Sequence, residues 1–139
     1  MYLKILFWLY IIALLAATLL FFRGAPYAPI ELDPIASYRR AMTAPAHLSR
    51  IEIRGIILNI AMFIPLGLMP PAIWPRLSKA YFMLPLVFAA TLSIETTQLL
   101  TSRGVFAIED IIHNTAGGIL GFLIFKALFK KKTLDKTQT

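Results

Sequence analysis

Residues 93–121 read SIETTQLLTSRGVFAIEDIIHNTAGGILG, a short polar loop with part of a long apolar segment on either side. The two segments, residues 80–100 and 110–129, are each long enough to cross a bilayer as a helix. Because so few residues connect them, the two helices are expected to be antiparallel neighbours. Charged side chains inside hydrocarbon are costly, so the acidic and amide residues of this stretch indicate a function as well as a fold.

The composition of the chain is that of a small membrane protein. Its 139 residues are 58% hydrophobic and its mean hydropathy is +0.73, whereas soluble domains are about 45–50% apolar. The length fits one domain over residues 1–139, and the apolar residues occur in blocks, as expected for membrane spans. There are no cysteines, which excludes disulfides and cysteine-bound metals. No soluble stretch is long enough to carry a basic face, so no nucleic-acid partner is expected.

Two further apolar segments precede the opening stretch. The predicted fold class is therefore all-α, an integral membrane bundle of four transmembrane helices at residues 4–22, 51–73, 80–100 and 110–129. Pro65 and Pro85 lie inside spans, and they predict kinks there. A cleaved signal peptide is the alternative for the first segment, but its apolar run is longer than usual and no clean cleavage site follows it.

The remaining segments are polar. Residues 23–50 contain four prolines, and they predict a loop with a short helix around residues 35–42. Residues 130–139 predict a basic tail.

The distribution of lysine and arginine predicts the orientation. Four spans place both termini on one side, which then carries eight basic residues against six on the other. The eight are Lys4, Arg76, Lys79, Lys126, Lys130, Lys131, Lys132 and Lys136. The positive-inside rule therefore favours cytoplasmic termini and a cytoplasmic tail, with residues 23–50 outside.

This topology brings the polar residues of three spans to the same membrane boundary. The candidate ligand-binding residues are Asn59, Glu95, Gln98, Arg103, Asp110 and Asn114. At 1.5 Å of rise per residue they lie within about 10 Å of the outer boundary. Glu95 and Gln98 share one helical face, and Arg103 is the nearest cation for Glu95 or Asp110. We interpret the group as the lining of one polar pocket.

Simpler roles exist for each member taken alone. Asp110 could cap its helix, Arg103 could anchor the loop at the interface, and Asn114 could join two helices by a hydrogen bond. Glu95 is harder to explain in this way, because a carboxylate inside a span needs a partner or water.

Catalytic and metal sites are less well supported. Glu95 and Asp110 are the candidates for acid–base catalysis, but no established catalytic motif is present. A metal site made by these two residues and His113 would match no standard ligand set. We therefore expect no metal and no cofactor.

Small residues predict where helices pack closely. Gly117 and Gly121 form a G-x-x-x-G pattern, for which packing within the bundle is favoured over homodimerisation. The full set of predicted packing residues is Phe63, Pro65, Gly67, Gly117, Gly118 and Gly121.

Taken together, these patterns resemble the VanZ-like family. They are N-x-x-x-F-x-P-x-G at residues 59–67, E-x-x-Q at residues 95–98, Arg103, and D-x-x-x-N-x-x-G-G-x-x-G at residues 110–121. These small bacterial membrane proteins are named for an accessory to glycopeptide (teicoplanin) resistance. The resemblance covers roughly residues 54–125 and implies a role at the cell envelope, in the bacterial inner membrane. Two positions depart from the family pattern: Ala107 stands where an acid is frequent, and Glu109 where aspartate is common.

We therefore predict an outer-leaflet pocket that binds or presents a cell-wall precursor, an envelope lipid or a related amphiphile. Besides the lipid bilayer, the expected partner is a lipid-linked cell-wall intermediate or a glycopeptide, with a link to antibiotic resistance. One alternative is a membrane-embedded enzyme that modifies a lipid-linked head group through Glu95 and Asp110. Another is a structural partner of a second envelope protein, for which substitutions at Gly117 and Gly121 would matter more than changes to the carboxylates.

Overall fold

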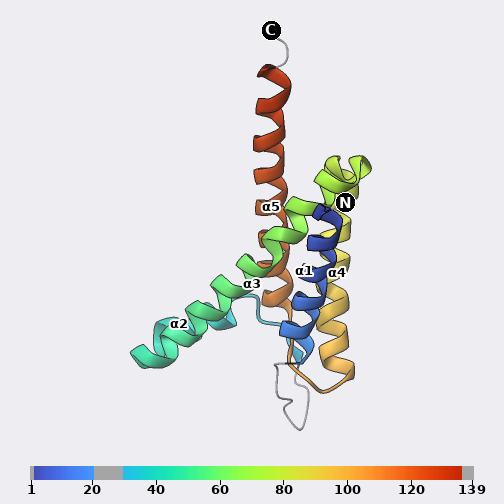
Figure 1. Ribbon diagram of the computed structural model, residues 1–139. Coiled ribbons are helices and arrows are strands. Elements are labelled where there is room, and N and C mark those ends of the chain that lie inside the picture. Colours follow the sequence, from blue (N-terminus) through green and yellow to red (C-terminus); the bar gives the residue numbers. More distant parts are fainter. Residues whose placement is uncertain (1, 21–29, 136–139) are drawn as a thin grey trace.

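Four long helices dominate the computed structural model, which describes residues 2–20 and 30–135 (Figure 1). They are α1 (Tyr2–Leu19), α3 (Ala46–Ile73), α4 (Ala80–Leu100) and α5 (Ile108–Asp135). Each contains a segment long and apolar enough to cross a membrane, which in α5 is Ile108–Phe129. The predicted all-α class with four apolar helices is confirmed. The last two residues of the predicted first span and the first part of the predicted loop, residues 21–29, lie outside the described residues.

Short elements connect the long helices. Helix α2 (Ala36–Thr43) corresponds to the short helix predicted in the first loop, and a 3₁₀ turn, η1 (Pro75–Ser78), links α3 to α4. Two strands of two residues each, β1 (Ile30–Glu31) and β2 (Phe106–Ala107), pair in parallel. This pairing, which the sequence did not predict, fastens the first loop to the connection between α4 and α5.

Two helices extend beyond the predicted spans. Helix α3 begins at Ala46, five residues before the predicted start, so the first loop is shorter than predicted. Ala44 precedes Pro45 and is extended with ψ of 157°, as proline requires of its predecessor, so only Ala44 and Pro45 separate α2 from α3. Helix α5 continues to Asp135, and only residues 136–139 of the predicted tail lie outside the described residues.

The helices are arranged as a bundle with an arm. Helix α1 begins and α5 ends at the same end of the bundle, and the α4–α5 connection lies at the other end (Figure 1). Helix α3 crosses the bundle obliquely, and its first turns project sideways together with α2. We call residues 36–54 the projecting arm.

Close packing of α3 on α5 holds the centre of the bundle together. A Cβ atom added at Gly117 or Gly121 would overlap the carbonyl oxygen of Ile60 or Ile64, and one at Gly67 would overlap the Gly118 carbonyl. The backbones of α3 and α5 therefore touch directly.

Pro65 lies half-buried within α3. Large apolar side chains fill the spaces on either side of the contact between α3 and α5. They include Phe7, Leu14, Phe63, Leu66, Met83, Val87, Phe122 and Phe125. The bends predicted at Pro65 and Pro85 stay a prediction; both residues lie inside helices.

Candidate functional site

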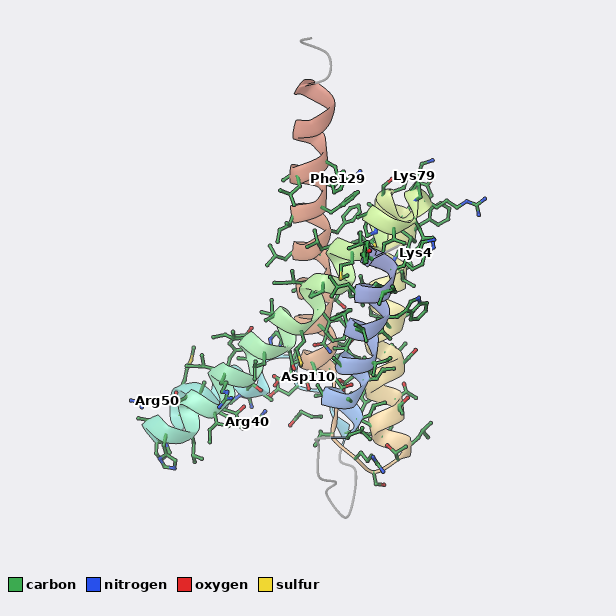
Figure 2. The ribbon with its side chains drawn as sticks, viewed as in Figure 1. Lys4, Arg40, Arg50, Lys79, Asp110 and Phe129 are labelled. Carbon is green, nitrogen blue, oxygen red and sulfur yellow. The ribbon has the colours of Figure 1, made fainter. Side chains whose placement is uncertain are left out.

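A pocket of about 400 Å³ lies at the end of the bundle where α4 connects to α5. Its polar lining is Thr18, Ser37, Glu52, Asn59, Glu95, Gln98, Asp110 and Asn114. Its apolar lining is Ala17, Ile51, Ile56, Met62, Ile94 and Val105. Figure 2 shows Asp110 at the base of the bundle, while Arg40 and Arg50 lie on the projecting arm. The structure thus brings together five of the six residues predicted to bind a ligand.

Asp110 stands in the first turn of α5 and is tied to α3. Asn59 donates from Nδ2 to Asp110 Oδ1 over 2.6 Å. The position near the positive end of the helix macrodipole also suits a carboxylate. Within the described residues, the second carboxyl oxygen, Oδ2, makes no hydrogen bond, so it is available to a ligand.

Glu95 is buried on α4, with 2% of its surface exposed. Its Oε2 accepts a hydrogen bond of 3.2 Å from the backbone N–H of Ala107, the residue immediately before α5. In the family pattern an acid is frequent at position 107, where this chain has alanine. In the structure the backbone N–H of Ala107, not its side chain, contacts the site. The other carboxyl oxygen of Glu95 has no partner among the described residues.

Two amide side chains complete the floor of the pocket. Gln98 donates from Nε2 to the carbonyl oxygen of Thr18 over 2.8 Å and so joins α4 to α1. Asn114 donates from Nδ2 to Thr91 Oγ1 over 2.9 Å and is 3% exposed. Its Oδ1 is buried without a hydrogen-bond partner in the described part of the chain. A buried acceptor left unpaired costs about 1–3 kcal/mol, so this atom calls for a donor that the described residues do not supply.

Arg103 does not join the pocket. Its side chain is exposed, and its Nη1 donates over 3.2 Å to the carbonyl oxygen of Leu19 at the end of α1. The predicted pairing of Arg103 with Glu95 or Asp110 is therefore wrong. The cause is the tight turn after α4, in which Ser102 adopts a positive φ of 51° and Arg103 N–H bonds to the Gln98 carbonyl.

A second polar cluster behind the pocket was missed from the sequence. Glu109 is 2% exposed and accepts bonds from the backbone N–H and the hydroxyl of Ser37, on α2. Arg40 reaches Glu109 over 3.5 Å and Glu52 over 3.0 Å. The available signal was a second acid beside Asp110, but the sequence could not show that α2 packs against it.

His113 also contacts α2. Its Nε2 lies 2.9 Å from the hydroxyl of Tyr38. In residues 2–20 and 30–135, no three histidine, cysteine or acidic side chains are grouped closely enough to hold a metal ion. The pocket therefore offers carboxyl and amide chemistry.

Fold and site together define a multi-pass membrane protein with four candidate spans and a polar pocket near one end of the bundle. The chain belongs to the VanZ/LLP1 family, whose model matches residues 7–130. This match confirms the resemblance inferred from residues 54–125 and extends it over most of α1 and the last span. No curated protein and no solved structure matches the chain significantly.

Proposed function

We propose that this protein binds an amphiphile of the bacterial cell envelope, a cell-wall precursor or an envelope lipid, in the pocket at the base of the bundle. The observation that carries the proposal is the unpaired Oδ1 of Asn114, buried in a pocket that also holds two partly unpaired carboxylates. Buried polar atoms without partners are rare, and inside a membrane protein they commonly mark a ligand path.

The lining of the pocket suits a molecule with one polar and one apolar end. Ile51, Ile56 and Met62 on α3 face the cavity opposite the carboxylates. Gly55 lies among them and is exposed, and a Cβ atom added there would meet no atom within 4 Å. Because α3 carries no side chain at this point, the pocket is left open toward the side of the bundle, where lipid chains would lie.

The orientation that we propose places the pocket at the outer leaflet. Lys4 and Lys79 lie at the opposite end of the bundle from Asp110 (Figure 2). Under the positive-inside rule those lysines favour cytoplasmic termini. The pocket would then face the side on which cell-wall precursors are displayed, which agrees with the association of the VanZ-like family with glycopeptide resistance.

A second candidate function is enzymatic modification of a lipid-linked head group. It is favoured by one specific observation: Glu95 and Asp110 line the same pocket, and each has a carboxyl oxygen without a partner among the described residues. One could then act as acid and the other as base. The third hypothesis, a structural partner of another envelope protein, has less support, because Gly117 and Gly121 pack against α3 of this same chain.

The test is to extract the amphiphile that co-purifies with the chain from bacterial membranes in a mild detergent and to quantify it by mass spectrometry. Gly55→Trp should fill the pocket without disturbing the helix contacts and should reduce the retained amphiphile at least tenfold. Ala61→Trp is the matched control, because Ala61 is exposed on α3 and does not line the pocket. Equal retention in both variants and the wild type would contradict the proposal.

A further inference from the structure

Among the described residues, the lining of the pocket is acidic and includes no basic side chain. Glu52, Glu95 and Asp110 line it, whereas the described lining includes no lysine, arginine or histidine. Arg40 is bonded to Glu52 and to Glu109, and Arg103, which is not among the lining residues, donates to the Leu19 carbonyl at the end of α1. A negatively charged ligand would therefore meet charges of its own sign, and a positively charged ligand would meet opposite ones.

Several hydrogen-bond acceptors of the pocket lack a partner among the described residues. The amide nitrogens of Asn59, Gln98 and Asn114 each donate one of their two N–H groups to a protein acceptor. Among the described residues, the acceptors that make no hydrogen bond include Glu95 Oε1, Asp110 Oδ2 and, fully buried, Asn114 Oδ1. A ligand that satisfies them must donate hydrogen bonds.

We infer that the pocket binds a primary ammonium group carried by the amphiphile. An ammonium group offers three N–H donors and a positive charge, which suits these acceptors and the negative charge of the Glu95 and Asp110 carboxylates. The apolar part of the same molecule would leave past Gly55 and Ile51, between α3 and α1. This inference rests on the proposed function and specifies the chemical class of its ligand.

The experiment uses the full chain in neutral maltoside micelles and three probes with the same alkyl chain: octylamine, octanol and octyl phosphate. Binding is followed by the rise of the thermal unfolding midpoint with probe concentration, since a ligand specific for the folded state stabilises it. Octylamine is expected to raise the midpoint with saturation, and the other two probes are not. The chain carries a net charge of +7, so non-specific attraction would favour octyl phosphate instead.

Variants test whether octylamine raises the unfolding midpoint by binding in the pocket. Asp110→Asn and Glu95→Gln should each weaken octylamine binding at least tenfold, and Gly55→Trp, which leaves the carboxylates intact, should remove it. Asp33→Asn is the control, because Asp33 pairs with Arg39 and does not line the pocket. Unchanged octylamine binding in both carboxylate variants, or an equal loss in the control, would overturn the inference.

The failure of this inference can be distinguished from failure of the proposed function. If octanol or octyl phosphate binds more tightly than octylamine and Gly55→Trp abolishes that binding, the pocket binds amphiphiles but the ammonium assignment is wrong. If no probe responds to Gly55→Trp, both the assignment and the proposed function are contradicted.

Discussion

Asn59 on α3 and Asp110 on α5 are joined by a hydrogen bond of 2.6 Å from Nδ2 to Oδ1, and both side chains line the pocket. The bond links the helix pair that packs most extensively in the bundle. It also fixes one oxygen of the Asp110 carboxylate and leaves the other for a ligand. The same contact thus contributes to the fold and to the site.

Replacing Asn59 by leucine should destabilise the protein by about 1–3 kcal/mol, because the carboxylate of Asp110 loses its donor in a partly buried position. Unfolding of the detergent-solubilised chain measures this loss. The double variant Asn59→Leu, Asp110→Leu should lose less than the sum of the two single variants, since the two side chains interact. Additive losses would show that the hydrogen bond contributes nothing to stability.

Gly121 and Gly55 should respond in opposite ways to an added side chain. Gly121→Leu is expected to destabilise the protein by at least about 3 kcal/mol, because its Cβ would overlap the backbone carbonyl of Ile64. Gly55→Ala should instead stabilise it by about 0.5–1 kcal/mol, since the position is helical and open. The two variants are compared by thermal unfolding. Similar effects at both positions would contradict the direct backbone contact of α3 with α5.

The Glu109 cluster should hold α2 against the bundle. Glu109→Leu removes the acceptor for the Ser37 N–H and hydroxyl and for Arg40, so residues 36–43 should exchange amide hydrogens at least tenfold faster. Arg39→Gln is the control, because Arg39 is exposed and pairs only with Asp33 among the described residues. Unchanged exchange over residues 36–43 in the Glu109 variant would refute this anchoring role.

The orientation that we propose has its own test. A reporter joined after Lys132 should give the cytoplasmic signal. The reason is that lysines are concentrated on the side of the two termini, and the positive-inside rule places such a side in the cytoplasm. A matching reporter inserted after Met42, on the projecting arm, should give the external signal. The opposite pair of signals would place the pocket at the inner leaflet.

The sequence predicted well the features that depend on local composition. Hydropathy located the four spans, and counting spans was sufficient to bring Asn59, Glu95 and Asp110 to one boundary. A proline explains why α3 starts earlier than hydropathy suggested, since Pro45 ends one helix and permits the next to begin at once. The polar residues that follow it in α3, among them His47, Ser49 and Arg50, interrupt any apolar run, so hydropathy alone predicts a loop there.

Features that depend on distant contacts were not predictable in this way. The direction of Arg103 is set by the turn at Ser102, whose positive φ no composition rule anticipates. The bond from Ser37 to Glu109 joins residues 72 positions apart in the sequence. It exists only because α2 folds back onto the start of α5, and neither segment alone carries a signal for that contact.

Photo-crosslinking in native membranes tests the central claim most directly. A photoreactive residue is placed either at Met62, which lines the pocket, or at Ala61, which is exposed and lies outside it. The proposed function predicts that position 62 crosslinks one class of envelope amphiphile far above its abundance, and that position 61 crosslinks the bulk lipids in proportion to theirs. If both positions yield the same bulk-lipid profile, the pocket holds no specific amphiphile and the claim is contradicted.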